Sequence, residues 1–188
     1  TSMRLFIGIP LPADVVGHLA DVRRAVEPRI ARVAWTRPEN LHVTLKFLGE
    51  VDDPRAADVA AALATVTGPR FRLRATALEC FPPRNGPVRI VAAAFAGPDL
   101  ACLTDLQSRI EAACTPLGFP PERRAYRPHT TLARPRTPLP APARTRMADA
   151  TAHLWPGPDF DVTAYTLFES RDQGRGREYL PLARVPLG

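Results

Sequence analysis

Two of the four histidines stand in the same short pattern, His42-Val43-Thr44-Leu45 and His129-Thr130-Thr131-Leu132. In a β-strand, residues i and i+2 point to the same face, so each histidine is expected to project beside the threonine two positions later, roughly 7 Å away. If the two strands face each other across a cleft, the site holds two imidazoles and two hydroxyls.

This set of groups suits the cleavage of a phosphodiester. One neutral imidazole can take a proton from the attacking water while the other, protonated, donates to the departing ribose oxygen, because an imidazole pKa of about 6.5 allows both forms near neutral pH. Threonine hydroxyls can donate hydrogen bonds to non-bridging phosphate oxygens. The residues alone do not decide which histidine is the acid and which is the base.

The same chemistry requires no metal ion and no other cofactor. No cluster of carboxylates lies beside either motif, and a zinc site needs a third ligand that the sequence does not show. A single His-x-Thr in a strand is usually a surface pair, so the prediction depends on its repetition in two matching apolar strands. The other histidines, His18 and His153, are expected on the surface.

Basic residues near the motifs are further candidates for substrate contact. Arg127 has the strand parity of His129 and could reach the phosphate, although a solvated role is equally open. Lys46, the only lysine of the chain, has the parity of His42 and could meet RNA phosphates, although a surface role is slightly favoured. Arg134 has the opposite parity to His129, so a structural role is expected unless the strand contains a bulge.

Three aromatic residues near the motifs could stack on a nucleobase. Trp35 and Tyr126 remain open candidates for such a contact. Phe47 has the parity of the apolar residues Val43 and Leu45, so it is expected in the core.

Hydrophobic periodicity predicts alternating strands and helices that would position these residues. Strands are expected at residues 4–9, 33–36, 41–48, 71–80, 88–95, 129–133, 160–169 and 178–185, the last two forming a hairpin. Helices are expected from residues 14, 53 and 99, with a short one near 145–153. A strand, a helix and a His-x-Thr-Leu strand thus occur twice in similar order. This repeat is explained about equally well by an internal duplication and by the chance alternation of strands and helices.

Length and composition are compatible with one domain or two joined lobes. The chain has 188 residues, of which 45% are hydrophobic, and a net charge of +6, which permits an anionic partner without requiring one. Its three cysteines predict a reduced, cytoplasmic protein, and no apolar run is long enough to span a membrane. Thr1 and Ser2, which precede Met3, are expected to be residues added by cloning.

Longer runs around the motifs carry a family resemblance. The runs NLHVTLKFLGEV (40–51) and YRPHTTLAR (126–134), with the ending LFESR…G…EYLPL, resemble the two-histidine phosphoesterase superfamily and its paired His-x-Thr-x (HXTX) motifs. Within it, they resemble the bacterial and archaeal RNA 2′,3′-cyclic phosphodiesterases, first described as 2′-5′ RNA ligases. The resemblance begins at RLFIGIPLP and covers nearly the whole chain.

The resemblance implies an α+β fold in which residues 1–188 form a single two-lobed domain. Two antiparallel sheets would flank a central cleft, with helices outside and pseudo-twofold symmetry. It implies hydrolysis of an RNA 2′,3′-cyclic phosphate to a 2′-phosphomonoester without metal or cofactor. It also makes His42 the proton donor and His129 the proton acceptor, with Thr44 and Thr131 holding the phosphate.

Alternatives with the same residues remain open. The same site could join RNA ends by a 2′-5′ bond or open an ADP-ribose cyclic phosphate. A catalytically idle module that binds RNA ends is a third hypothesis, but such a module has no need of a paired acid and base. The partners expected are RNA ends or nucleotides with a 2′,3′-cyclic phosphate, bound by a monomer that needs no membrane and no obligate protein partner.

Overall fold

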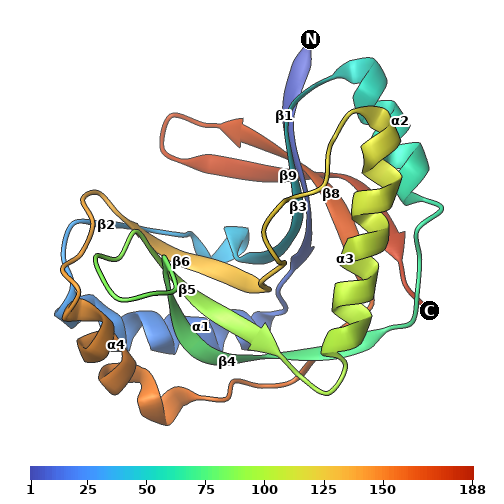
Figure 1. The fold of residues 1–188 in the computed structure, drawn as a ribbon. Coiled ribbons are helices and arrows are strands. Elements are labelled where there is room, and N and C mark those ends of the chain that lie inside the picture. The colour runs from blue at the N-terminus through green and yellow to red at the C-terminus, as the bar shows by residue number, and fades with distance from the viewer.

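Two antiparallel sheets form the framework of the computed structural model, which describes residues 1–188 (Figure 1). Sheet I has the strand order β3-β1-β8-β9 and sheet II the order β2-β6-β5-β4-β7. The strands of sheet I are β1 (Ser2–Pro10), β3 (His42–Asp52), β8 (Ala164–Asp172) and β9 (Arg177–Pro186). Those of sheet II are β2 (Val33–Trp35), β4 (Phe71–Phe81), β5 (Ile90–Ala96), β6 (His129–Pro135) and β7 (Phe160–Val162).

Helices cover the outer sides of the two sheets, as Figure 1 shows. They are α1 (Ala13–Val26), α2 (Asp53–Leu63), α3 (Leu100–Cys114) and α4 (Ala143–Thr151), with short 3₁₀ turns at Glu27–Arg29, Pro38–Asn40, Thr115–Leu117 and Ala152–Leu154. Helices α1 and α4 pack together beside sheet II, and α2 and α3 pack together beside sheet I. None of these helices combines the length and apolar character needed to cross a membrane.

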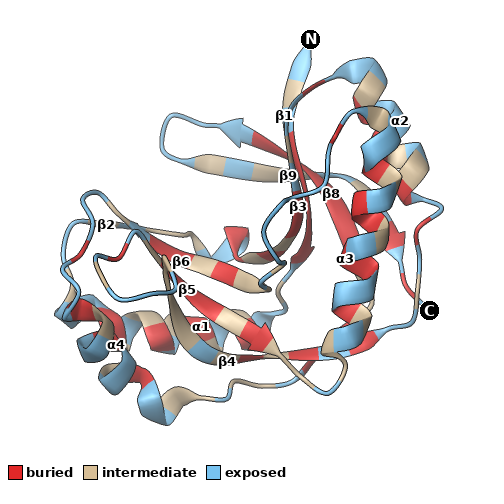
Figure 2. Ribbon diagram, viewed as in Figure 1, coloured by how far each residue is buried: buried red, intermediate tan, exposed pale blue.

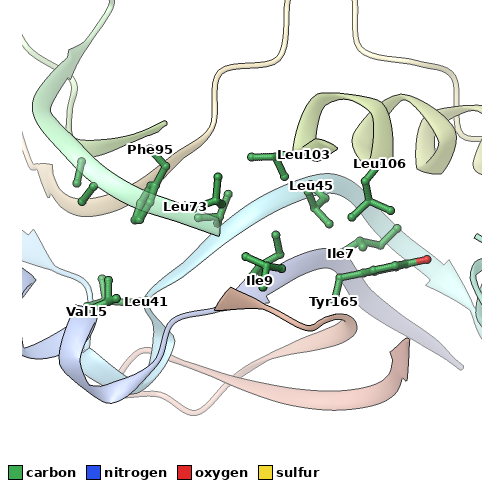
Figure 3. Close-up of a cluster of buried hydrophobic side chains, with 14 of the residues drawn as sticks. Ile7, Ile9, Val15, Leu41, Leu45, Leu73, Phe95, Leu103, Leu106 and Tyr165 are labelled. Carbon is green, nitrogen blue, oxygen red and sulfur yellow. The ribbon is translucent and has the colours of Figure 1, made fainter. Parts of the chain in front are cut away.

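The predicted apolar faces of the helices are buried, because they pack against the sheets (Figure 2). In α1 these are Val15, Leu19, Val22 and Val26, and in α3 they are Leu103, Leu106, Ile110 and Cys114. Figure 3 shows side chains of sheet I directed toward Leu103 and Leu106 of α3. The buried residues of both halves join in one continuous core, so the two sheets are fixed relative to each other.

The duplicated order seen in the sequence corresponds to two similar arrangements of strands. In the first half β1 and β3 are antiparallel neighbours joined through α1, and in the second half β5 and β6 are antiparallel neighbours joined through α3. The α+β fold with two antiparallel sheets is therefore confirmed, and each motif strand pairs with the strand that precedes the helix of its half.

One predicted element is wrong. The single strand expected at 160–169 is two strands, because the chain leaves sheet II after Val162 and enters sheet I at Ala164. Residues 160–162 pair with β4, and residues 164–172 pair with β9 and, in part, with β1. Only Thr163 separates the two strands, and neither Gly nor Pro marks the crossing in the sequence.

Candidate functional site

Both His-x-Thr pairs line one cleft between the two sheets. The cleft has a volume of about 550 Å³, and its wall includes His42, Thr44, His129 and Thr131. The other lining residues come from five strands, the segment before β3 and β3 itself. They are Arg4, Leu5 and Phe6 of β1, Thr36 and Asn40 before β3, Phe47 and Gly49 of β3, Ile90 of β5, Arg134 of β6, Ser170 of β8, and Arg177 and Tyr179 of β9. The four side chains predicted to act together are thus brought to one place from positions 42–44 and 129–131.

The first histidine is held by hydrogen bonds on both sides of its ring. Its Nδ1 donates to the Asn40 carbonyl oxygen at 2.7 Å, and its Nε2 lies 2.8 Å from the Thr44 hydroxyl. Because a carbonyl can only accept, Nδ1 keeps its proton and Nε2 is the nitrogen that titrates. The ring packs against Phe6 at a centroid distance of 4.7 Å and against Tyr179 at 5.3 Å.

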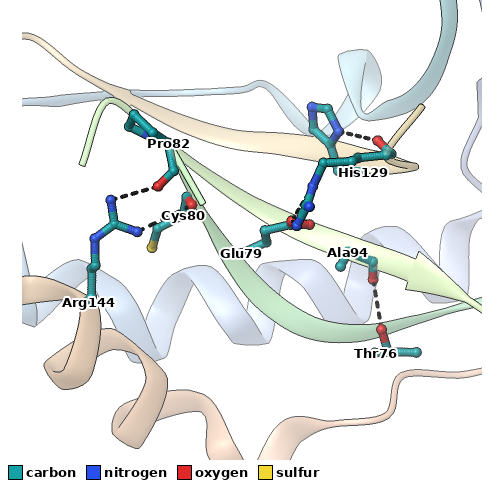
Figure 4. Close-up of polar contacts among 8 residues, drawn as sticks. Thr76, Glu79, Cys80, Pro82, Ala94, His129 and Arg144 are labelled. Carbon is teal, nitrogen blue, oxygen red and sulfur yellow. Dashed lines mark hydrogen bonds and ion pairs between the residues drawn. The ribbon is translucent and has the colours of Figure 1, made fainter. Parts of the chain in front are cut away.

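The second histidine is oriented in the same way from the opposite sheet (Figure 4). His129 Nδ1 donates to the Arg127 carbonyl oxygen at 2.7 Å, two residues earlier, and its ring packs against Phe81 at 4.7 Å. Its Nε2 has no hydrogen-bond partner within the protein. Each imidazole is therefore locked in the tautomer that leaves Nε2 as the reactive nitrogen.

A β-bulge follows each motif and changes which residues face the cleft. Along β3, Gly8 of β1 pairs with Thr44 and Ile7 pairs with Lys46, so Leu45 is an extra residue. Along β6, Ala92 of β5 pairs with Thr131 and Val91 pairs with Ala133, so Leu132 is an extra residue. An extra residue reverses the alternation of side chains beyond it.

The reversed alternation corrects two expectations about β3. Phe47 was expected in the core, but it lines the cleft and is 62% exposed. Lys46 was expected to share the face of His42, but it lies on the opposite face and is buried. Its ammonium group is 2.5 Å from a Glu111 carboxylate oxygen, so it cannot meet a substrate phosphate.

The equivalent bulge in β6 brings Arg134 to the cleft, where it is exposed. A structural role was expected for Arg134 only if β6 had no bulge, and β6 has one. Arg134 and Phe47 stand at equivalent positions, each five residues after the histidine of its motif.

The remaining candidates for substrate contact lie outside the residues that line the cleft. Arg127 is exposed but paired with Glu79. Trp35 lies in the wall of a different, smaller pocket, beneath the Arg23 guanidinium. Tyr126 packs behind the first motif and donates a hydrogen bond to the Thr44 carbonyl at 2.8 Å.

Sequence reasoning missed most of the cationic and aromatic residues of the cleft wall. Three arginines, Arg4, Arg134 and Arg177, line the cleft, and no acidic residue does. Arg177 and Tyr179 come from the β8–β9 hairpin, within the ending that carried part of the resemblance. No group of three or more His, Cys, Asp or Glu side chains is arranged to hold a metal ion.

Comparison with known proteins identifies the family of this chain. The model of the LigT-like phosphoesterase family matches residues 9–91 and 99–177, which is most of the sequence. The chain belongs to the LigT-like phosphoesterase family.

Individual relatives of this LigT-like phosphoesterase agree with that assignment. The RNA 2′,3′-cyclic phosphodiesterase of Thermus thermophilus is 33% identical over 193 residues, covering 98% of this chain and 90% of that protein. The protein of the same name from Aeropyrum pernix is 35% identical over 120 residues, covering 64% of this chain and 67% of that protein. The resemblance inferred from the paired motifs is thus confirmed.

Solved structures show the same fold. The crystal structure of E. coli LigT in complex with 3′-AMP superposes with a TM-score of 0.76 at 24% identity, covering 100% of this chain and 99% of that chain. The crystal structure of TT0787 of Thermus thermophilus superposes with a TM-score of 0.76 at 26% identity, covering 98% and 97% of the two chains.

The environment of His42 in this LigT-like phosphoesterase favours the neutral imidazole. Burial lowers the pKa of His42 below its ordinary value of 6.5, the hydrogen bond to Asn40 partly opposes this, and the nearby charge of His129 lowers the pKa further. The mutual repulsion is expected when two imidazoles share one cleft.

We expect the pKa of His42 in the free protein to lie below 6.5 when it is measured by NMR titration of the ring resonances. In the unfolded chain the same histidine takes up its proton near pH 6.5, so the unfolded state holds more protons in the interval between the two values. The contribution of His42 to the free energy of unfolding is therefore complete above pH 6.5 and decreases as the pH falls through that interval. A folded-state pKa above 6.5 would contradict this description.

Gly8 on β1 leaves room for the His42 ring. A Cβ at this position would lie 3.1 Å from the Val43 carbonyl oxygen and 3.2 Å from His42 Cδ2, both closer than ordinary contact. We expect Gly8→Ala to displace the ring, to reduce the free energy of unfolding by about 1–3 kcal/mol, and to reduce phosphodiesterase activity. Urea unfolding and a phosphodiester assay measure the two effects.

Gly17→Ala is the matched control for this substitution. Gly17 lies on the exposed side of α1, where a Cβ meets nothing within 4 Å. Alanine there should raise stability by up to about 1 kcal/mol and leave activity unchanged. Equal activity in the two variants would show that His42 does not depend on the space at Gly8.

Proposed function

We propose that the protein hydrolyses RNA 2′,3′-cyclic phosphate ends to 2′-phosphomonoesters by acid–base catalysis between two histidines, without a metal ion. The observation that carries this proposal is that both His-x-Thr pairs line one cleft, with Nδ1 of each ring bound to a backbone carbonyl oxygen. The names of the relatives from Thermus thermophilus and Aeropyrum pernix support the choice of substrate.

The cleft wall suits a phosphate between the two sheets. Thr44 and Thr131 supply hydroxyl donors from opposite sides for the non-bridging oxygens, which carry the negative charge during reaction. Arg134 and Arg177 add positive charge, and the absence of acidic residues from the wall leaves that charge uncompensated. These groups can bind a cyclic phosphate at the end of an RNA or on a free nucleotide.

The distribution of aromatic side chains supports His42 as the proton donor. Phe6 and Tyr179 pack against His42, and the exposed ring of Phe47 lies 6.2 Å from Phe6, so an apolar surface for a nucleobase lies on the His42 side. The leaving 3′-oxygen belongs to the same nucleoside. An acid that protonates this oxygen must therefore stand on the side where the nucleoside binds.

The open Nε2 of His129 supports its role as the base. This nitrogen makes no hydrogen bond within the protein, so it can accept one from a water molecule, whereas Nε2 of His42 already contacts the Thr44 hydroxyl. Water attacks phosphorus as its proton passes to His129. The bond from phosphorus to the 3′-oxygen breaks as His42 gives a proton to that oxygen, and the phosphate remains on the 2′-oxygen.

Substrate binding reconciles this role with the lowered pKa of His42. A histidine that is neutral in the free protein is a poor proton donor. A phosphodiester anion beside Nε2 favours the charged imidazolium and raises the pKa of His42. The proton is thus held most firmly in the complex, where it is needed.

We further infer that residues 1–188 act as one two-lobed unit, as a monomer in the cytoplasm. The continuous core across both sheets and a cleft built from one chain support this inference. All three cysteines are free, which fits a reducing compartment.

Replacement of either histidine tests the mechanism. His42→Ala and His129→Ala should each lower kcat on a 2′,3′-cyclic nucleotide about 10²–10⁴-fold, with unchanged far-UV circular dichroism. The assay is run after dialysis against EDTA, where the wild-type rate should persist. Turnover near the wild-type rate in both variants, or loss of wild-type activity in EDTA, would overturn the mechanism.

A substrate panel in the same assay separates the alternatives. RNA with 2′,3′-cyclic ends should be hydrolysed faster than an ADP-ribose cyclic phosphate is opened or 2′-5′ linked RNA is formed. Binding of the cyclic ends without turnover at any pH would instead identify a module that only binds RNA.

The assignment of acid and base has its own test. A p-nitrophenyl phosphodiester carries a leaving group that needs no protonation, so His42→Ala should retain far more of the wild-type rate on this substrate than on a cyclic nucleotide. His129→Ala should lose activity on both substrates, because water must still be deprotonated. The opposite pattern would assign the acid to His129.

A further inference from the structure

Buried hydrogen bonds join the back of the first motif strand to the second half of the chain. The Thr44 carbonyl accepts from the Tyr126 hydroxyl at 2.8 Å, and the Leu45 carbonyl accepts from Gln107 Nε2 at 3.3 Å. The next residue, Lys46, donates from Nζ to the Pro120 carbonyl at 2.9 Å. Three consecutive residues of β3 are thus bound to groups that lie 62 to 82 residues later.

The position of β3 at the edge of sheet I, together with its bulge, explains why these carbonyls need partners from outside the sheet. An extra residue interrupts the ladder between neighbouring strands, so backbone groups beside it lack a strand partner. A buried carbonyl without a partner destabilises the fold, and side chains from elsewhere must satisfy it. Tyr126 and Gln107 do so for Thr44 and Leu45.

The bulge also turns Lys46 into the core, where Glu111 of α3 pairs with it. The Lys46 side chain is 2% exposed, and its Nζ is 2.5 Å from one carboxylate oxygen of Glu111. The other carboxylate oxygen accepts from the Glu122 backbone N–H at 2.7 Å. This buried pair therefore binds the segment 118–128 at two points, the Pro120 carbonyl and the Glu122 amide.

That segment leads directly into the second motif. Tyr126 stands three residues before His129, and its partner Thr44 stands two residues after His42 and contacts that ring. Burial raises the pKa of the Tyr126 phenol well above its ordinary value, so it remains a protonated donor at neutral pH. A short path of hydrogen bonds thus runs from one catalytic candidate toward the other behind the cleft wall.

We propose that Tyr126, supported by the Lys46–Glu111 pair, is a positioning residue that fixes the separation of the two imidazoles across the cleft. This inference rests on the proposed function. In-line transfer needs the base, the phosphorus and the acid aligned, and a misplacement of 1 Å can reduce the rate about 10²-fold. Tyr126 makes no contact with the cleft, so it acts through Thr44 and the segment that carries His129.

The test compares two tyrosines whose hydroxyls both bind backbone carbonyls, one behind the first motif and one away from the cleft. Tyr126→Phe removes the hydroxyl that binds Thr44, and Tyr165→Phe removes a buried hydroxyl that donates to the Leu63 and Val66 carbonyls, away from the cleft. Tyr126→Phe should lower kcat on a 2′,3′-cyclic nucleotide about 10–100-fold with KM within twofold of wild type. Tyr165→Phe should lower Tm by at least as much and leave kcat unchanged.

Equal kcat values in the two variants would overturn the proposal, as would a change in KM alone. A wild-type protein without activity on cyclic phosphates would instead overturn the proposed function, so the two failures are distinguishable. The pH profile of kcat/KM is a second measurement, and a loss of stability alone does not change it. The optimum of kcat/KM should keep its position in Tyr165→Phe and shift in Tyr126→Phe, because the interaction between the two imidazoles changes with their separation.

A second variant examines the ion pair. The double substitution of Lys46→Met with Glu111→Leu replaces two buried charges by apolar side chains of similar size, a change that folded proteins often tolerate. It also removes the bonds to Pro120 and Glu122. A folded double variant should show a reduced kcat with KM retained, and full kcat would overturn the part assigned to the pair.

Discussion

Each motif strand has an extra residue directly after its threonine, Leu45 in β3 and Leu132 in β6, and the lining of the cleft depends on these two residues. A strand without a bulge places every second side chain on the same face, so His42, Thr44 and Lys46 would point together. Because of the bulge at Leu45, Lys46 points away from the cleft and Phe47 points into it. The bulge at Leu132 does the same in β6.

This change of faces places one residue of each bulged strand in the cleft and its neighbour in the core. On the cleft side it presents Phe47 beside the aromatic group at His42, and Arg134 beside Thr131. On the other side it buries Lys46, the only lysine, where its charge is balanced by Glu111 rather than offered to a substrate. The two bulges thus add an aromatic ring to the cleft wall from sheet I and an arginine from sheet II.

The sequence predicts the parts of this site that depend on local periodicity. The apolar faces of α1 and α3, the strand at the first motif and the common face of His42 and Thr44 follow from spacings of two and of three to four residues. The paired motifs also identify the family. The bulge in β3 is not visible in the sequence, because the alternation of apolar and polar residues continues without interruption from Leu41 to Phe47.

Features that depend on contacts between distant segments could not be predicted. The passage from sheet II to sheet I at Thr163 has no turn signal, so residues 160–169 resemble one strand. Arg177 and Tyr179 reach the cleft because β9 is paired along β8, and nothing in their own spacing indicates it. Tyr126 was a candidate for stacking on a base, but a long-range hydrogen bond to the Thr44 carbonyl holds it behind the wall.

The helices exchange sides between the halves of the chain, and this has a consequence for how the protein reaches its native state. Helix α1 follows a strand of sheet I but packs beside sheet II, and α3 follows a strand of sheet II but packs beside sheet I. The connecting helix of each half thus covers part of the other sheet, and α3 also contacts β4 of sheet II. Closing the single core therefore requires contacts between residues far apart in the chain, which favours slow, cooperative folding over the independent folding of two halves.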